Sequence, residues 1–248
     1  MSRLFKIFLL VVLSFLSSFN VSANETFFSI ENKGSSVEEL VEGGSDLSHF
    51  LDDAFVLSKR AEVIADGLPS QFPNLTIDEL TAIKVYTSDE VRNGVKIYES
   101  LNTQLRAGNL DDYNKGLSEL LDNGMSKLPD NTSSSVFRGV YGDEATWAKT
   151  WSKNEIIEFK DFKSSSLSNS EALKFMTRKN GDVFYEILNP KGKNVCPVSC
   201  SIEELEILFK KGSKFNVENI QDGFNFLDPN DPLTVLGTGR KVTLRLID

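Results

Sequence analysis

Apolar residues recur at three- and four-residue intervals through most of the first half of the chain. Residues 46–65 show this spacing and predict an amphipathic helix, which Gly67 and Pro69 would end. Thr76-Ile-Asp-Glu79 has the pattern of a capping box, so a short helix is expected from there to about Tyr86. This part of the chain is therefore expected to be mainly helical.

Two longer amphipathic segments follow. Ser88 precedes apolar positions that continue at helical spacing to Arg106, and Gly108 is expected to stop that helix. Residues 111–127 predict a further helix, which Pro129 would close.

The second half contains short runs rich in β-branched and aromatic residues, which are typical of strands. These runs are residues 136–141, 156–159, 183–188, 205–209, 214–217 and 241–247. Asn180-Gly181 is expected to turn a hairpin. Helices come first and strands later, without βαβ alternation, so an α+β fold is expected rather than a doubly wound sheet. Gly237-Thr-Gly239 precedes a strand and does not match a phosphate loop or a dinucleotide-binding turn.

The N-terminal residues have the pattern of a secretory signal peptide. Basic residues precede the apolar run 7–19, and Val21-Ser-Ala23 offers small residues for cleavage after about Ala23. The protein is therefore expected to be secreted. The apolar run is short for a bilayer, so no stable membrane span is expected.

The mature chain is expected to form one domain behind a short arm. Residues 24–45 are polar and predict a flexible arm, and residues 46–248 predict a single domain. Within it, a helical part (46–130) would precede a β-rich catalytic core (131–248).

Charge and cysteine content narrow the classes of partner. The chain has 248 residues with 36 acidic and 27 basic side chains, a net charge of −9, which argues against a nucleic-acid partner. Cys196 and Cys200 are its two cysteines, and in an exported chain they can form a disulfide bond. With His49 as the one histidine, they could not complete a zinc site without carboxylates, so no metal is expected.

Two nearby carboxylates are the first candidates for chemistry. If residues 201–209 are extended, Leu205, Ile207 and Phe209 share one face, while Glu204 and Glu206 project side by side from the other. Taken alone, such a pair is more often a solvated edge than a site.

Two polar features precede the carboxylates along the chain. Arg138 lies inside an apolar strand, where an unpaired charge is costly, so it needs an anion. Ser164-Ser-Ser166 places three hydroxyls near the end of another strand. If each feature is taken singly, an internal salt bridge is the commoner explanation for the arginine and a simple turn is the commoner explanation for the serines.

Together and in this order, these features resemble the arginine-specific mono-ADP-ribosyltransferase toxins, which have Arg, Ser-Thr-Ser and Glu-x-Glu motifs. The resemblance covers roughly residues 86–248, and Gly212-Ser-Lys-Phe215 matches the end of the third motif. It implies a mixed or antiparallel β-sandwich core with the helical half packed on it. Tyr98-Glu-Ser-Leu-Asn102 is similar to the family's helix that closes over the nicotinamide end of NAD. Ser165 replaces the family's threonine, and Ser201 stands where relatives often place a substrate-recruiting aromatic.

The resemblance implies three catalytic residues. Glu206 would stabilise the oxocarbenium-like ribose as nicotinamide leaves, and Ser164 would hold Glu206 in place. Glu204 would orient an incoming guanidinium and take its proton. Because family members that modify asparagine have glutamine there, Glu204 implies arginine as the acceptor.

The resemblance also implies NAD as a substrate and a set of residues that bind it. They are Tyr98, Asn102, Arg138, Gly139, Ser164, Ser165, Ser166, Phe175 and Arg178. Arg138 and Arg178 would contact the phosphates, Gly139 would admit backbone groups to the nicotinamide amide, and Phe175 would pack on the nicotinamide ring.

Two other functions fit the same residues. An NAD glycohydrolase would use water in place of the acceptor, which is otherwise an unidentified protein with an accessible arginine. A non-catalytic exported binding module would use Glu204 and Glu206 as surface charges toward a basic partner.

Overall fold

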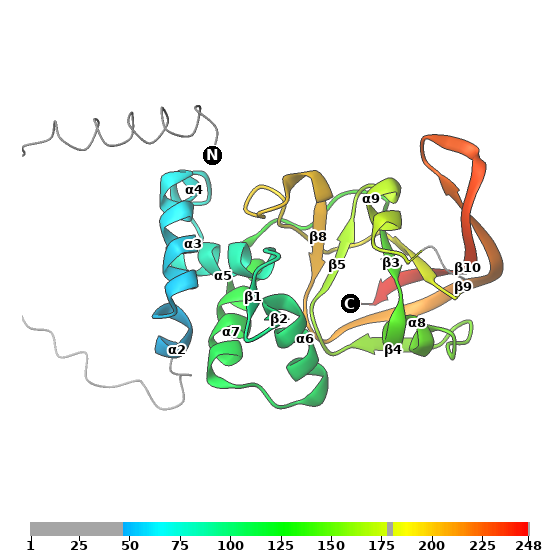
Figure 1. Cartoon of the computed structure of the whole chain (residues 1–248). Coiled ribbons are helices and arrows are strands. Elements are labelled where there is room, and N and C mark those ends of the chain that lie inside the picture. Colours follow the sequence, from blue (N-terminus) through cyan, green and yellow to red (C-terminus); the bar gives the residue numbers. More distant parts are fainter. Residues whose placement is uncertain (1–46, 178–180, 248) are drawn as a thin grey trace, which may run out of the picture. The chain divides into compact units, whose positions relative to one another are not determined.

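The computed structural model describes residues 47–177 and 181–247 of the chain (Figure 1). The predicted signal peptide and arm, and Arg178, lie outside the described residues. The helices are α2 (Ser48–Leu51), α3 (Ala54–Ala65), α4 (Leu68–Gln71), α5 (Ile77–Tyr86), α6 (Ile97–Ala107), α7 (Asp112–Lys127), α8 (Gly142–Ala148), α9 (Asn169–Lys174) and the 3₁₀ helix η1 (Ile202–Glu204). The strands are β1 (Val91–Arg92), β2 (Val95–Lys96), β3 (Ser135–Val140), β4 (Ile156–Phe159), β5 (Lys163–Ser166), β6 (Val183–Leu188), β7 (Lys193–Asn194), β8 (Glu206–Phe209), β9 (Ser213–Asp228) and β10 (Asp231–Ile247).

The capping-box prediction for α5 is confirmed. The Thr76 hydroxyl accepts a hydrogen bond from the Glu79 backbone N–H at 3.2 Å, and the Glu79 carboxylate accepts one from the Thr76 N–H at 2.8 Å. The helix predicted at residues 46–65 is instead two helices, since Asp53 is extended and its side chain caps α3 by accepting from the Phe55 N–H at 3.0 Å.

The single helix predicted from Ser88 to Arg106 is wrong at its N-terminal end. β1 and β2 form an antiparallel hairpin there, and α6 begins only at Ile97. Asn93 and Gly94 have φ values of 54° and 81°, the left-handed conformation that a two-residue hairpin turn requires. The hairpin turn predicted at Asn180-Gly181 includes Asn180, which lies outside the described residues, and the described element ahead of β6 is the helix α9.

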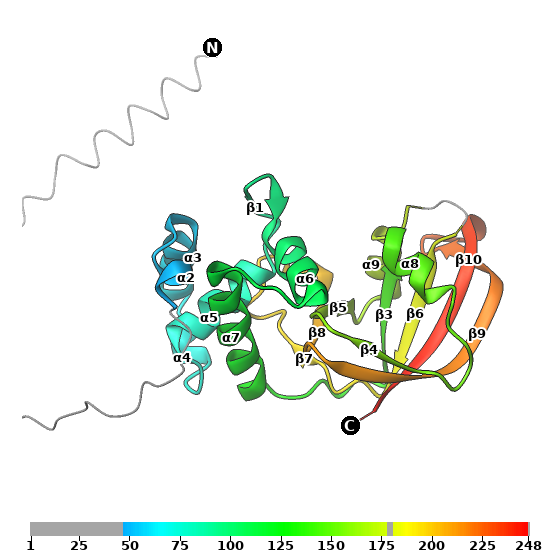
Figure 2. The same cartoon turned by 90° about the horizontal axis from the view of Figure 1, so that it is seen from below.

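The eight strands from β3 to β10 form a mixed sheet in the order β4-β9-β10-β6-β3-β5-β8-β7. The β10–β6 pair is parallel and the other pairs are antiparallel. In the middle of the sheet, β3 and β5 share a single residue pair, Phe137 with Ser166. Figures 1 and 2 show the helices α2 to α7 gathered beside β5 and β8, and α8 and α9 beside β3. The segregation of helices from a large mixed sheet confirms the predicted α+β class.

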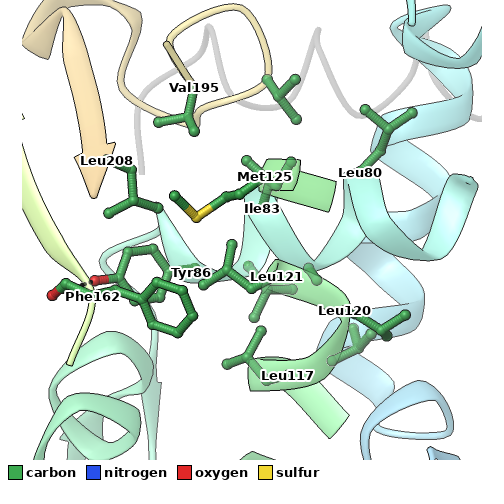
Figure 3. Packing of buried hydrophobic residues seen from close by; sticks show 14 of the residues in the cluster. Leu80, Ile83, Tyr86, Leu117, Leu120, Leu121, Met125, Phe162, Val195 and Leu208 are labelled. Carbon is green, nitrogen blue, oxygen red and sulfur yellow. Dashed lines mark hydrogen bonds between the residues drawn. The ribbon is translucent and has the colours of Figure 1, made fainter. Parts of the chain in front are cut away.

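Two main apolar cores hold this arrangement together. One lies among the N-terminal helices and includes Phe162, just ahead of β5, and Leu208 of β8 (Figure 3). The other lies on the opposite face of β8 and contains Ile207 and Phe209 together with residues of β3, β6, β9, β10 and α8. Both faces of β8 are therefore buried, which fixes the strand from two sides.

Candidate active site

A cavity of about 370 Å³ opens where α5, α6, α9 and η1 approach β3, β5 and β8. Its lining includes every described residue that the sequence analysis placed at the site: Tyr98, Asn102, Arg138, Gly139, Ser164, Ser165, Ser166, Phe175, Glu204 and Glu206. Residues far apart in the sequence are thus brought to one pocket whose volume is ordinary for a small-molecule site.

Glu206 is the buried carboxylate of the cavity. It begins β8, is only 5% exposed, and accepts a hydrogen bond from the Ser164 hydroxyl at 2.5 Å. Burial raises the pKa of Glu206 to about 7, and the charge of Glu204 adds to this, while the Ser164 bond and Arg138 oppose it. A solvated edge therefore does not describe Glu206.

Glu204 reaches the cavity by a different route from the one predicted. The strand begins at Glu206, while Glu204 ends η1, and Leu205 between them has a φ of 51°. The prediction that both carboxylates project from one extended strand is wrong, because the left-handed residue turns the chain between them. Leu205 is 39% exposed and does not join Ile207 and Phe209 in the core.

The loop that contains Glu204 is tied to β5. The Ser166 hydroxyl donates to the Glu204 carbonyl at 2.6 Å, and the Leu167 N–H donates to the Leu205 carbonyl at 3.1 Å. Burial raises the pKa of Glu204, and the carboxylates of Asp89, Glu203 and Glu171 add to the effect. Hydroxyls at alternate positions of β5 therefore contact both glutamates, one through its side chain and the other through its backbone.

Ser165 differs from the serines on either side of it. Its side chain is buried, and within the described residues its hydroxyl has no hydrogen-bond partner. Ser165 pairs across the sheet with Ile207, so it faces the side opposite to Ser164 and Ser166.

Arg138 already has an anion within the chain. Its Nε and Nη2 atoms donate to the two carboxylate oxygens of Glu144 at 3.2 and 3.1 Å, and its Nη1 atom donates to the Ser164 carbonyl at 2.7 Å. The internal salt bridge considered for this arginine is thus present, and Arg138 still lines the cavity. The sequence analysis did not identify Glu144. The available signal was an acidic residue six positions after Arg138, which the structure places on α8.

Gly139 has a packing role that its sequence position did not reveal. A Cβ atom there would lie 2.3 Å from the Ala172 carbonyl oxygen and 2.6 Å from Met176 Cγ. Only glycine lets α9 lie this close to β3. Phe175 follows α9 and is 49% exposed at the cavity.

The helix side of the cavity is organised around Tyr86, which the sequence analysis did not single out. The Asn102 amide donates to the Tyr86 hydroxyl at 3.1 Å and accepts from the Phe162 N–H at 3.2 Å. The rings of Tyr86 and Tyr98 meet edge to face with centroids 6.4 Å apart. Asn102 therefore fastens α6 to the start of β5.

Cys196 and Cys200 are free thiols in this structure, so the predicted disulfide is not formed in it. The Cys196 thiol donates to the Ile202 carbonyl at 3.1 Å, and the Cys200 thiol donates to the Lys84 carbonyl at 3.4 Å. Burial raises the pKa of both thiols. Cys196 thus contacts the backbone of η1, which contains Glu204, and Cys200 contacts the backbone of α5.

Within residues 47–177 and 181–247, no group of three or more His, Cys, Asp or Glu side chains could hold a metal ion. None of the described helices is long and apolar enough to cross a membrane.

Comparison with known proteins finds one family model that matches most of the chain. The family model for NAD:arginine ADP-ribosyltransferase matches residues 54–226. No curated protein sequence is significantly similar to the chain.

Solved structures share the fold at low sequence identity. Exoenzyme S from Pseudomonas aeruginosa, solved with human 14-3-3 protein beta and carba-NAD, is 18% identical with a TM-score of 0.58, over 80% of this chain and 86% of that one. The type III effector XopAI from Xanthomonas axonopodis pv. citri is 16% identical with a TM-score of 0.57, over 77% and 76%. The Vis toxin, an ADP-ribosyltransferase from Vibrio splendidus, is 14% identical with a TM-score of 0.53, over 85% and 89%. The chain therefore belongs to the NAD:arginine ADP-ribosyltransferase family, the enzymes that transfer ADP-ribose from NAD.

Proposed function

We propose that this protein is a secreted mono-ADP-ribosyltransferase that modifies an arginine of a target protein and releases nicotinamide. The observation that supports it best is the buried Glu206 carboxylate, which Ser164 holds in a cavity that Glu204 also lines. Burial makes this carboxylate costly to ionise, and such a cost is typical of a functional site.

The first step breaks the bond between the ribose and nicotinamide. The bonding electron pair leaves with the cationic nicotinamide, which becomes neutral, and positive charge develops on the ribose. Glu206, when ionised, would stabilise that charge in a site of low dielectric. No proton has to be supplied to the leaving group.

The second step joins the ribose to the acceptor. A guanidine nitrogen forms the new bond to the ribose carbon and loses one proton. Glu204, whose pKa is raised by burial and by neighbouring carboxylates, would orient the guanidinium and accept that proton. The crystal structure of Vis with agmatine, a small guanidine compound, supports the same acceptor chemistry.

The basic side of the cavity would receive the phosphates of NAD. Arg138 and Arg106 both line it, and Arg138 retains guanidinium N–H groups beyond those that Glu144 and Ser164 use. Tyr98 and Phe175 line the cavity as aromatic walls for the nicotinamide end. Arg178 would add a second phosphate contact, as the family resemblance implies.

The test is to incubate the mature protein with labelled NAD and either agmatine or a cell lysate. Nicotinamide release together with labelled agmatine or labelled protein is the expected result. Release of nicotinamide without any labelled acceptor would make the protein an NAD glycohydrolase, and no release at all would favour a binding module.

Secretion is part of the proposal and rests on the signal-peptide pattern of residues 1–23. N-terminal sequencing of protein recovered from culture medium should begin at about Asn24.

For protein from an oxidising compartment we also predict a Cys196–Cys200 disulfide, for which both thiols must leave their carbonyl acceptors. Two free thiols by mass spectrometry of that material would contradict the disulfide.

A further inference from the structure

Charged side chains form a continuous row beside the cavity. Glu144 lies between Arg138 and Lys163, and the Lys163 ammonium donates to Glu144 Oε2 at 2.9 Å. The same ammonium donates to Asp161 Oδ2 at 3.0 Å, and Asp161 also pairs with Arg106. The row thus alternates in sign from β3 across to α6.

The row is buried more deeply than stability alone would favour. Exposed fractions of the side chains are 18% for Glu144, 6% for Lys163 and 1% for Asp161. Burial would raise the pKa of Glu144, but the charges of Arg138 and Lys163 outweigh it and lower that pKa to about 2. Buried ion pairs often contribute less to stability than apolar side chains of the same size would. A role in placing neighbouring groups is therefore worth testing.

The row leads to Glu206 through Ser164. Arg138 donates to the carbonyl oxygen of Ser164, and the hydroxyl of the same serine donates to Glu206. Because β3 and β5 share only the Phe137–Ser166 pair, the Arg138 guanidinium supplies a link across this seam that strand pairing does not. All four residues of β5 pair with β8 on the other side, so Arg138 adds the contact that holds β5 at Ser164 toward β3.

We propose that Glu144 is a positioning residue for nicotinamide release: it fixes Arg138, and Arg138 holds Ser164 and, through it, the Glu206 carboxylate. Lys163 holds Glu144 from the other side. This inference rests on the proposed roles of Ser164 and Glu206.

The first test measures kcat and KM for nicotinamide release from NAD without an acceptor. Glu144→Ala should lower kcat roughly tenfold to a hundredfold, the loss usual when a reacting geometry is displaced. Glu144→Gln keeps an acceptor for Arg138 and should lose less. If Glu144 only helped Arg138 to bind phosphates, KM would rise and kcat would stay, which would overturn the inference.

A matched control comes from the same sheet. The Glu186 carboxylate forms an ion pair with Lys241, with 2.8 Å between Oε2 and Nζ. Both side chains are 26% exposed, and neither lines the cavity. Glu186→Ala should change kcat and KM less than twofold, even if its melting temperature falls as far as that of Glu144→Ala. An equal loss of kcat in Glu186→Ala would mean that general destabilisation explains the effect.

A double-mutant cycle tests the route through Ser164. If Glu144 acts by way of Ser164, the double variant Glu144→Ala/Ser164→Ala should have a kcat less than about threefold below that of Ser164→Ala alone. If the loss of kcat in the double variant equals the product of the losses in the two single variants, that route is contradicted. Should Glu144→Ala fail to fold, Glu144→Gln in the same cycle gives the same decision. Absence of nicotinamide release by the wild type would refute the proposed function, whereas an active wild type with independent losses would refute only this inference.

Discussion

At the scale of single residues, Glu206 is a carboxylate whose burial opposes stability. Its folded-state pKa of about 7 lies above the ordinary value of 4.5, so the folded protein binds this proton more tightly than the unfolded chain does. The stability that this proton contributes is therefore lost as the pH rises from about 4.5 through 7. The difference between the two pKa values corresponds to a cost on the order of 3 kcal/mol above pH 7.

Replacing Glu206 by glutamine should remove that cost. Glutamine keeps an acceptor for the Ser164 hydroxyl and has no charge to bury. Glu206→Gln should therefore be more stable than the wild type at pH 8 and should lose most of this advantage at pH 4.5. Urea unfolding at the two pH values measures it, and an equal or lower stability of the variant at pH 8 would contradict the pKa assignment.

The same titration should control the enzyme's pH dependence. Only the ionised carboxylate stabilises the developing positive charge on the ribose, so kcat/KM for nicotinamide release should rise with pH through about 7 and then level off. A rate that stays constant between pH 5 and pH 9 would show that Glu206 is already ionised at low pH or is not the group involved.

The residues that could be found from the sequence were those whose type and spacing follow a motif. Ser164 and Glu206 were found in this way and lie within hydrogen-bonding distance. Glu144 and Tyr86 were not found, because their importance lies in partners that only the tertiary structure brings near: Arg138 for the first and Asn102 for the second.

At the scale of elements, amphipathic periodicity predicted where helices lie, but the turn residues that separate one element from the next were not all recognised. The Asn93-Gly94 turn was overlooked because the apolar positions Val91 and Val95 also fit a helix at four-residue spacing. The strand containing Glu206 was extended too far back because a left-handed φ at a leucine is rare and leaves no sign in the sequence.

Gly139 provides a test of how one element positions another. An alanine Cβ would overlap the Ala172 carbonyl, so α9 must move away from β3 and take Phe175 with it. Gly139→Ala should destabilise the protein by about 1–3 kcal/mol, as overpacking usually does. It should also raise KM for NAD.

Phe175→Ala is the matching comparison, because that ring is half exposed and its loss should cost little stability. It should raise KM by a similar factor while leaving the melting temperature nearly unchanged. An unchanged KM in both variants would show that α9 does not position the NAD site.

At the scale of the whole domain, the order of helices and strands was enough to predict the α+β class, and the family resemblance named residues that line one cavity. Sheet order was beyond reach, since the parallel β10–β6 pair joins distant segments and β3 meets β5 at one residue pair. That seam lies at the cavity, where Arg138 crosses to Ser164. The part of the fold that was hardest to predict is therefore the part that assembles the site.

Two glutamates that are close in the sequence, Glu204 and Glu206, have different roles in the proposed reaction. Measuring NAD hydrolysis and ADP-ribosylation of agmatine in matched variants of the two residues tests this most directly. Glu206 is buried against Ser164 at the start of β8, while Glu204 lies on η1 across the turn at Leu205. Glu206→Gln should lose both activities by orders of magnitude, as expected when the main electrostatic contact is removed. Glu204→Gln should lose transfer to agmatine and keep much of its NAD hydrolysis. Parallel losses of both activities in both variants would contradict the account.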